Sequence, residues 1–530
     1  MSQIQITNLS FRHPGQTEYI FKDVNLTLDT NWKLGLIGRN GSGKTTLLKL
    51  LLGEYESNNA IGKNVEFEYF PYEIQNEDVM TLDIAYNIIP NLEEWRIFKE
   101  LNLIEVDADI LYRKFSSLSG GEKVKFLLIC AFLKENKFLL IDEPTNHIDE
   151  KSKKALSNYL KKKRGFILVS HDRKILNEVI DHVLYIGKQN ITLEQGNYDS
   201  WNFNKTNKDN NEMEQNEKLK KDIMKLEKAA KQTADWSNAI EKSKKGAVDK
   251  GHVGHQAAKM MKKAKVLENR RDKKIEEKSS LLIDVDNNPN LQMKPLVASR
   301  RNLILAQNLS IFYGEKIIFD KVSFQVDVGD RVAIKGKNGT GKSSILKLIV
   351  GENIPNNDAL KVMPKLKISY VSQMTDEVKG TISEYARQEG VDEGIFRAML
   401  QKLGVDKDKL DKDLADLSEG QKKKVMIARS ITDDSEIYIW DEPLNYLDIQ
   451  SREQIENMII KYQPTMLFIE HDEVFINKIA TKVIELDDGK IWKILKIIWI
   501  ILKKLTFIFF YDILKSVTRK KCFSCMDNYA

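Results

Sequence analysis

The order of apolar and polar positions is the same in two long parts of the chain. Each part begins with an alternating apolar stretch, which predicts an antiparallel strand region, and continues with a strand, a glycine-rich loop and an amphipathic helix. A later strand is almost continuously apolar, as is typical of a strand buried in a parallel sheet. Both parts therefore predict α/β domains. The segments are Ile4 and Ile6, KLGLIG (33–38), TTLLKLLLG (45–53) and KFLLID (137–142), and then Ile304 and Leu305, RVAIKG (331–336), SSILKLIVG (343–351) and EIYIWD (436–441).

Four sequence motifs recur in the same order, 298 to 300 residues apart. One order and one spacing indicate a tandem duplication rather than chance matches. The repeat divides the chain into a first domain (1–203), a linker (204–300), a second domain (301–489) and a tail (490–530). The pairs are GRNGSGKTT (38–46) and GKNGTGKSS (336–344), LSGGE (118–122) and LSEGQ (417–421), FLLIDEPTNHID (138–149) and IYIWDEPLNYLD (437–448), and SHD (170–172) and EHD (470–472).

The linker has a helical pattern of its own. Two sets of apolar residues each fall on one face of a helix, with a glycine-containing turn between them, and so predict an antiparallel helical hairpin. If it is helical from 206 to 242, the first arm is about 55 Å long. The two sets are Leu219, Ile223, Leu226 and Ala230, and Met260, Ala264 and Leu267.

The turn of this hairpin is strongly basic. Eight lysines and one acidic residue lie between Lys242 and Lys265. A run of charge is usually a solvated face, but its place at the end of a hairpin, with His252 and His255, favours contact with RNA phosphates.

Overall composition says little about the class of partner and somewhat more about the cellular compartment. A formal charge of +6 over 530 residues is too small to indicate a nucleic-acid partner by itself. Three cysteines are few for such a chain and favour a reducing compartment. The N-terminus has no secretory pattern, and no apolar run of about 18 residues occurs before residue 490, so neither a signal peptide nor a membrane span is expected there.

The glycine-rich loops have the spacing GxxxxGK[ST], in the strand–loop–helix context that a phosphate-binding loop requires. Their glycines let backbone N–H groups approach phosphate oxygens, and a helix N-terminus favours negative charge. We expect Lys44 and Lys342 to reach the β- and γ-phosphates, and Thr45 and Ser343 to bind Mg²⁺. The other candidate nucleotide-binding residues of the two loops are Gly38, Asn40, Gly41, Gly43, Thr46, Gly336, Asn338, Gly339, Gly341 and Ser344.

Acidic residues end the later apolar strand of each domain. Asp142 and Asp441 are placed to hold Mg²⁺, directly or through water. Glu143 and Glu442 follow at once, point elsewhere, and are expected to polarise the attacking water as catalytic bases.

A histidine follows the next apolar strand of each domain, as His171 and His471. A single histidine in such a place is usually structural. Two histidines at matching places favour a catalytic role in sensing the γ-phosphate.

With these motifs, LSGGE and LSEGQ resemble the signature sequence of ABC ATPases, which lies ahead of the acidic strand end as it does here. The resemblance covers about residues 1–489. It implies an α/β fold of two tandem ABC-type P-loop ATPase domains, joined by the helical hairpin linker, that bind ATP and Mg²⁺ and hydrolyse ATP. It also implies head-to-tail pairing of the domains within one monomeric chain. The signature residues Ser418 and Gly420 would close the site of Lys44, and Ser119, Gly120 and Gly121 would close the site of Lys342.

The two sites differ where this family has characteristic residues. The Q-loop glutamine is Gln373 in the second domain, where it is expected to contact nucleotide and Mg²⁺. Tyr72 stands at the matching place in the first domain, with Gln75 three residues on. We therefore expect two non-equivalent sites. Further differences are Tyr313, which suits the aromatic that stacks on adenine, against His13, and Glu419 against Gly120.

Two such domains joined by a charged helical linker, with Asn146-His147-Ile148-Asp149 after the first acidic pair, resemble the ABC-F class of translation factors. The resemblance implies that the linker, residues 205–290, enters the ribosomal E site. There it would approach the peptidyl-transferase centre and contact large-subunit rRNA and the P-site tRNA. It also implies a cytoplasmic, ribosome-associated protein without a stable membrane partner.

Two segments, NWKLGLIGRNGSGKTTLLKLL and LSEGQ, resemble the antibiotic-resistance members of Lsa type. The first domain also lacks an extra insertion that housekeeping members often carry, because Tyr72 and Ser119 are 47 residues apart and Gln373 and Ser418 are 45 apart. The resemblance implies ribosome protection against lincosamides, pleuromutilins and streptogramin A. A housekeeping translation factor and the ATPase subunit of a drug-exporting transporter remain the alternatives.

The tail, 490–530, matches nothing else in the chain. Lysines interrupt its apolar runs, so a membrane span is not expected, and an interfacial amphipathic helix stays open. Cys522 and Cys525 form one CxxC without a second pair, so a zinc site is not expected. We assign the tail no function.

Overall fold

The computed structural model describes most of the chain. The described residues are 3–15, 19–56, 60–62, 65–145, 148, 150–187, 190–243, 290–314, 316–337, 339–487 and 490–496. They fall into two units: Met1–Tyr198 with Pro289–Ala530, which holds both ATPase domains, and Asp199–Asn288, which holds the linker. No helix among the described residues is long and apolar enough to cross a membrane.

The first domain is built on a six-stranded sheet in the order β4-β5-β6-β3-β7-β8. Its strands are parallel except β8, which runs antiparallel to β7. The central strands are apolar on both faces because helices cover both faces of such a sheet. The strands are β3 (Lys33–Gly38), β4 (Glu66–Phe70), β5 (Lys137–Asp142), β6 (Phe166–Val169), β7 (His182–Ile186) and β8 (Ile191–Gln195).

A separate antiparallel pair, β1 (Gln3–Phe11) and β2 (Phe21–Asp29), forms the strand region predicted from Ile4 and Ile6. Both isoleucines are buried in a core shared with the phosphate-loop helix. The helices of the domain are α1 (Lys44–Leu52), α2 (Thr81–Ile88), α3 (Glu94–Leu103), α4 (Gly120–Leu133), α5 (Glu150–Lys162) and α6 (Arg173–Val179), with short 3₁₀ helices η1 (Ala108–Tyr112) and η2 (Phe115–Ser117).

The second domain repeats this plan. Its six-stranded sheet has the order β13-β14-β15-β11-β16-β17, and β10-β9-β12 form the antiparallel sheet. The strands are β9 (Asn302–Tyr313), β10 (Lys316–Asp327), β11 (Arg331–Gly336), β12 (Leu360–Val362), β13 (Ile368–Val371), β14 (Ile437–Asp441), β15 (Met466–Ile469), β16 (Lys482–Asp487) and β17 (Lys490–Lys496). The helices are α9 (Lys342–Val350), α10 (Ile382–Gln388), α11 (Glu393–Lys402), α12 (Lys407–Leu410), η4 (Leu414–Asp416), α13 (Glu419–Thr432), α14 (Ile449–Tyr462) and α15 (Glu473–Ile479).

The second domain extends beyond the limits set by the repeat. Residues 490–496, which the repeat places in the tail, form β17 and pair antiparallel with β16. Leu291 and Met293, which the repeat places in the linker, are buried in the core of the second domain. The physical reason is that the repeat motifs mark sites and central strands, whereas edge strands and packed connections carry no motif.

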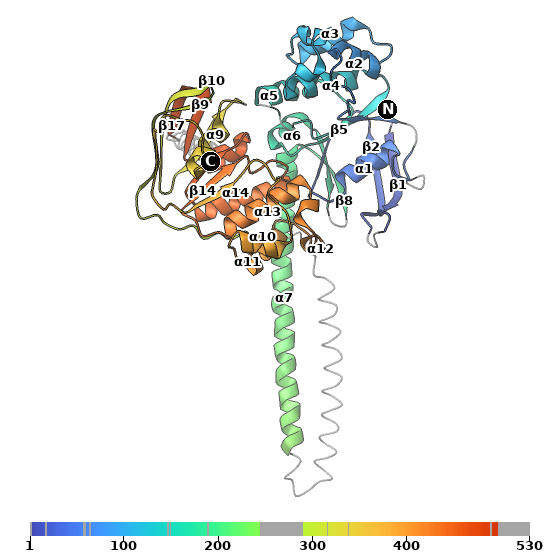
Figure 1. Cartoon of the computed structure of the whole chain (residues 1–530). Coiled ribbons are helices and arrows are strands. Elements are labelled where there is room, and N and C mark those ends of the chain that lie inside the picture. The colour runs from blue at the N-terminus through green and yellow to red at the C-terminus, as the bar shows by residue number, and fades with distance from the viewer. Residues whose placement is uncertain are drawn as a thin grey trace, which may run out of the picture. The chain divides into compact units, whose positions relative to one another are not determined.

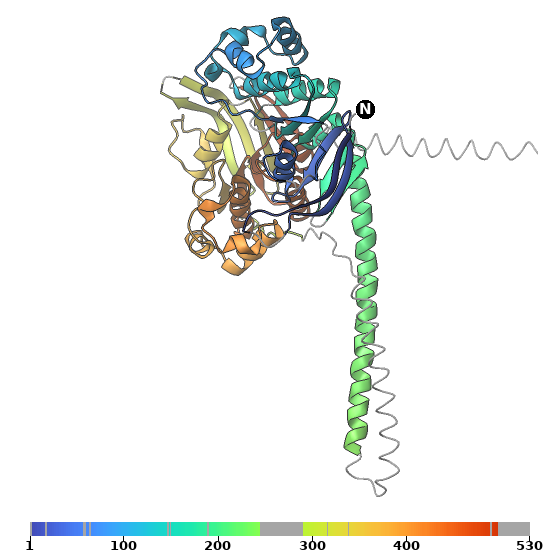
Figure 2. The ribbon, with the colours of Figure 1, turned by 90° about the vertical axis from the view of Figure 1, so that its right-hand side faces the viewer.

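Helix α7 (Tyr198–Ser243) is continuous over 46 residues, as both views show (Figures 1 and 2). It confirms the predicted helix of the first linker arm and begins several residues earlier than expected. At about 1.5 Å per residue it is about 69 Å long. Leu219 and Ile223, two members of the predicted apolar seam, are partly buried.

Some predictions fall outside the described residues. These concern Asn146, His147, Asp149 and Asn338, the return arm and basic turn of the linker (244–289), and the tail from 497 onward.

Candidate functional site

Each glycine-rich loop runs from a strand end to a helix start, as predicted. Gly38 ends β3 and Gly336 ends β11. Gly43 and Gly341, immediately before α1 and α9, have φ of 98° and 84°, a region that favours glycine. A Cβ on either would lie 2.6 Å from an isoleucine methyl group, so these positions exclude larger residues. Asn40, Gly41 and Gly339 lie in the loops, and Thr45, Thr46, Ser343 and Ser344 in the first turns of α1 and α9.

The loop lysines fold back over their own loops. Lys44 Nζ donates to the carbonyls of Gly38 at 2.8 Å and Arg39 at 3.0 Å. Lys342 donates to the two equivalent carbonyls, both at 2.8 Å. Burial lowers the pKa of each lysine. An ammonium beside a helix N-terminus and a glycine-rich backbone can bind phosphate oxygens.

Asp142 and Asp441 end β5 and β14, and burial raises the pKa of each carboxyl. The Ser343 hydroxyl opposes that rise in the pKa of Asp441, and among the described residues neither carboxylate oxygen of Asp441 has another hydrogen-bond partner. A buried carboxylate beside a hydroxyl in a phosphate-binding loop fits a hard cation such as Mg²⁺. Asp142 Oδ2 instead accepts from the Tyr69 hydroxyl at 3.1 Å and the Thr45 hydroxyl at 3.4 Å.

The predicted catalytic pairs are brought together in both domains. His171 Nε2 lies 3.3 Å from Glu143 Oε1, and His471 Nε2 lies 3.5 Å from Glu442 Oε1. Glu143 and Glu442 have φ of 48° and 45°, a costly backbone conformation that proteins keep mainly at functional sites. Each glutamate contacts the histidine of its own domain, whereas Asp142 contacts two hydroxyl groups, so neighbouring carboxylates have different partners.

The two glutamates differ in their surroundings. Glu442 Oε2 accepts from Gln373 Nε2 at 2.9 Å and Asn445 Nδ2 at 2.6 Å. Burial acts to raise the pKa of Glu442. The hydrogen bond and charge of His471, together with the hydrogen bond from Gln373, outweigh burial and hold this pKa at about 2. Burial, and then the charge of Asp142, raise the pKa of Glu143 to about 8. Glu442 is therefore held in its ionised form, whereas the surroundings of Glu143 favour the protonated form.

Tyr72 occupies the Q-loop place of the first domain but does not act as a glutamine would. Its ring lies 5.1 Å from the Lys134 ammonium. Gln75, three residues on, is exposed. Tyr69 supplies the polar contact to the acidic strand end. Sequence reasoning missed Tyr69, because its hydroxyl reaches a residue 73 positions away and no motif links the two.

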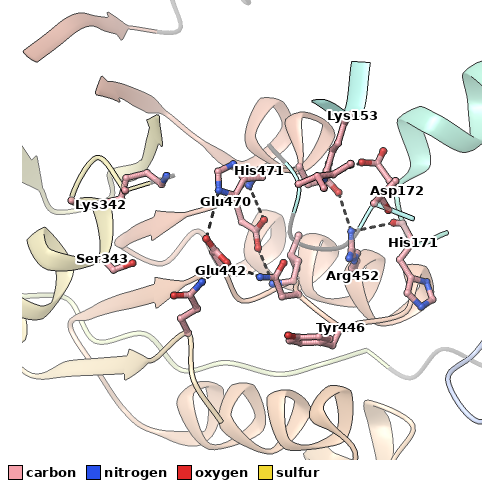
Figure 3. Close-up of a pocket in the computed structure, with 18 of the residues that line it drawn as sticks. Lys153, His171, Asp172, Lys342, Ser343, Glu442, Tyr446, Arg452, Glu470 and His471 are labelled. Atoms are coloured by element: carbon pink, nitrogen blue, oxygen red, sulfur yellow. Dashed lines mark hydrogen bonds and ion pairs between the residues drawn. The ribbon is translucent and has the colours of Figure 1, made fainter. Parts of the chain in front are cut away.

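A cavity of about 430 Å³ opens at the second phosphate loop (Figure 3), within the range of small-molecule sites. Tyr313, half exposed, lines this cavity, and its hydroxyl lies 3.2 Å from the Ser344 hydroxyl. Lys342, Ser343 and Glu442 lie on one side in Figure 3, and His171 on the other. The predicted residues in the lining are Tyr313, Gly339, Gly341, Lys342, Ser343, Ser344, Gln373, Glu442 and His471 from the second domain, and Glu143 and His171 from the first.

The signature serines cap helices. Ser119 caps α4 through a capping box with Glu122, Ser418 caps α13 through one with Gln421, and Gly120 and Gly121 open α4. These caps fix the entrance of each helix.

The second signature lies against the phosphate loop of the first domain, whereas Asn338, the counterpart of Asn40, falls outside the described residues. A Cβ on Gly420 would lie 3.2 Å from Asn40 Nδ2, and Asn40 Nδ2 donates to the Tyr446 carbonyl at 3.0 Å. Ser119 and Gly120 are absent from the described lining of the cavity. Closure of each site by its predicted signature stays a prediction.

Helix α14 joins the domains, a role that sequence reasoning missed. Arg39 Nε donates to Gln450 at 2.6 Å, and Arg452 Nη1 donates to the His171 carbonyl at 3.1 Å. Arg173 and Glu456 form a buried ion pair. The only available signal was the repeat itself, which places α14 directly after an acidic strand end.

Comparison of the sequence with known proteins agrees with this geometry. The family model described as ABC transporter matches residues 21–146 and 319–445. The "ABC transporter F family member 2" of Arabidopsis thaliana is 27% identical over 548 residues, covering 92% of this chain and 77% of that protein. The chain carries two ABC-type ATPase domains and is similar to ABC-F proteins over most of its length.

The protein is an ATPase with two ATP-binding domains. It is 28% identical over 500 residues to "Ribosome protection protein VmlR" of Bacillus subtilis, covering 92% of this chain and 88% of that one. Its fold is similar to a chain in the "Crystal structure of the complex of archaeal ribosomal stalk protein aP1 and archaeal ribosome recycling factor aABCE1", with a TM-score of 0.59, 18% identity, and coverage of 91% and 88%. At that identity the likeness establishes the tandem fold alone.

Proposed function

We propose that this protein is an ABC-F member that binds the ribosome when it holds ATP and protects the ribosome from antibiotics of the peptidyl-transferase centre. The drug classes are lincosamides, pleuromutilins and streptogramin A. The observation that carries the proposal is the similarity to VmlR, which runs through both domains and covers 92% of this chain. On this proposal the protein acts in the cytoplasm, associated with ribosomes and without a stable membrane partner.

On this proposal, ATP binding and hydrolysis by the two domains determine when the protein is bound to the ribosome. ATP and Mg²⁺ draw the domains together head to tail within one chain, with Ser418 and Gly420 closing on Lys44, and Ser119 and Gly120 closing on Lys342. The placement of Gly420 beside Asn40 supports the first of these closures. Mg²⁺, held by Thr45 with Asp142 and by Ser343 with Asp441 and Gln373, would neutralise charge on the terminal phosphates.

The linker is the part that meets the ribosome. Residues 205–290 enter the E site, and the segment 236–261 approaches the P-site tRNA and large-subunit rRNA. The continuous helix α7 supports this proposal, because its 46 residues give about 69 Å of reach. The lysines between 242 and 265 would neutralise phosphates and make binding salt-dependent, with a log–log slope of about −0.7 to −0.9 per phosphate contacted.

Ribosome co-sedimentation of the Glu143→Gln/Glu442→Gln variant tests the proposal. ATP should still close the domains while hydrolysis stalls, so the variant should pellet with ribosomes when ATP is present. A Lys44→Ala/Lys342→Ala variant, which loses both phosphate contacts, is the matched control and should stay in the supernatant. A glutamate variant that stays unbound at low and moderate salt contradicts ribosome binding.

Purified translation with lincomycin or tiamulin tests the protective role. The wild-type protein should restore translation, and the Lys44→Ala/Lys342→Ala variant should not. Ribosome binding without rescue would make a housekeeping translation factor the better conclusion. Drug protection in cells that vanishes in purified translation, together with recovery of the protein in membrane fractions, would favour the transporter subunit.

A further inference from the structure

Lys423, on α13, is a charged residue inside the second domain. Its side chain is 1% exposed. Its ammonium donates to the main-chain carbonyls of Ser372 at 2.8 Å, Asp441 at 3.2 Å and Gln373 at 3.5 Å. A buried ammonium is costly unless it is hydrogen-bonded, and here the three acceptors are backbone oxygens of two segments that form the second site.

Those two segments carry the groups that surround the attacking water's position. The first segment presents Gln373, whose amide donates to Glu442 at 2.9 Å. The second is the end of β14, where Asp441 is followed by Glu442. By holding both backbones, Lys423 fixes the distance across which the Gln373–Glu442 hydrogen bond forms.

Glu470 is a second buried charge in the same region. Its carboxylate is 3% exposed and accepts the backbone N–H of Leu444 at 2.7 Å and of His471 at 3.0 Å. Through the second of these bonds, Glu470 holds the backbone of His471, whose imidazole faces Glu442.

The first domain has neither charge. The repeat aligns Lys423 with Val124 and Glu470 with Ser170. Ser170 lies 3.1 Å from the Thr145 hydroxyl, so a short neutral contact replaces the carboxylate. This is also the domain with Tyr72 at the Q-loop place, where no glutamine needs to be held.

We propose that Lys423 and Glu470 are positioning residues specific to the second site, which hold Gln373 and His471 against Glu442 and thereby set the rate of ATP hydrolysis there. The proposal goes beyond ribosome binding and drug protection. It is tested on the isolated full-length protein, so failure of the ribosome proposal leaves it unaffected.

The test measures single-turnover hydrolysis of radiolabelled ATP in the Glu143→Gln background, above the baseline of Glu143→Gln/Glu442→Gln. Lys423→Met keeps the length of the side chain and removes its donors. We expect its rate to fall about 100-fold, because misplacing reacting groups by about 1 Å has that effect. Its affinity for a fluorescent ATP analogue should stay within about twofold, since binding and chemistry separate when only positioning is lost. Lys461→Met, which removes an exposed lysine at the end of α14, should change neither quantity.

A purely structural role is distinguished by Lys423→Met/Glu470→Gln, measured together with the melting temperature. Removing both charges should recover stability lost in the single variant, yet the hydrolysis rate should stay low. A double variant that recovers both stability and rate would overturn the proposal, as would a Lys423→Met rate within about twofold of its parent. Absence of hydrolysis above the baseline in the parent itself would also overturn it, because the second site would then have no rate to set.

Discussion

The two ATP sites share their motifs and differ in what surrounds them. At the second site, Gln373, Asn445 and His471 converge on Glu442, beside a cavity of about 430 Å³. At the first, His171 contacts Glu143 and no glutamine does so among the described residues, and the loop of Lys44 lies against Gly420 and Tyr446 of the other domain. The two sites thus share the phosphate-loop motif and differ at the Q-loop position, where Gln373 stands in one and Tyr72 in the other. This comparison predicts faster hydrolysis at the second site.

The ion pairs between the domains also differ in how deeply they are buried. Of the variants considered, Arg173→Ala should lower the free energy of unfolding most. Its ion pair with Glu456 is buried, with the two side chains 5% and 2% exposed. Removing Arg173 leaves the buried Glu456 paired, among the described residues, only with Lys478, 2.9 Å away and half exposed, so the cost should be about 3 kcal/mol, the low end for a broken buried pair. Chemical denaturation should show this loss. Lys174→Ala breaks the more exposed pair with Glu473 and should cost less than about 1 kcal/mol; equal losses in the two variants would contradict the comparison.

Gln373→Ala should slow ATP hydrolysis at the second site and leave hydrolysis at the first site unchanged. It removes the amide that donates to the ionised Glu442, and a hydrogen bond to a charged group is worth about 1.5–3 kcal/mol, or about 10- to 100-fold in rate. Steady-state ATPase assays in the Glu143→Gln background measure this directly. Gln75→Ala is the control, because Gln75 is exposed; if it reduces hydrolysis as much as Gln373→Ala, the assignment of the Q-loop residue fails.

Tyr69→Phe should have the smallest effect, confined to the first site. It removes only the hydroxyl that donates to Asp142, a contribution of about 0.5–1.5 kcal/mol. In the Glu442→Gln background, the Mg²⁺ concentration that gives half-maximal ATP binding should shift by up to about tenfold. The same shift in a Tyr370→Phe variant would show that the tyrosine does not distinguish the two sites.

The sequence predicted those parts of the two ATP sites whose residues follow a fixed local spacing. The phosphate loops, the acidic strand ends and the Glu–His pairs lie where the motifs place them, and so does the difference between Gln373 and Tyr72. The contributions of Tyr69, Lys423 and Arg452 were not predictable in this way. Lys423 and Arg452 bond to backbone carbonyls, which leave no signal in a sequence, and Tyr69 meets its partner only across adjacent strands.

The limits of the domains were less predictable for a related reason. Strand β17 and the buried residues Leu291 and Met293 belong to the second domain through packing and strand pairing. Neither feature repeats a motif, so the duplication could not reveal it.

The most direct test of the central comparison is the steady-state ATPase rate of Glu143→Gln beside that of Glu442→Gln. If the second site is the one prepared for turnover, Glu442→Gln should lose most of the hydrolysis, and Glu143→Gln should keep most of it. Equal losses in the two variants, or the greater loss in Glu143→Gln, would contradict the account.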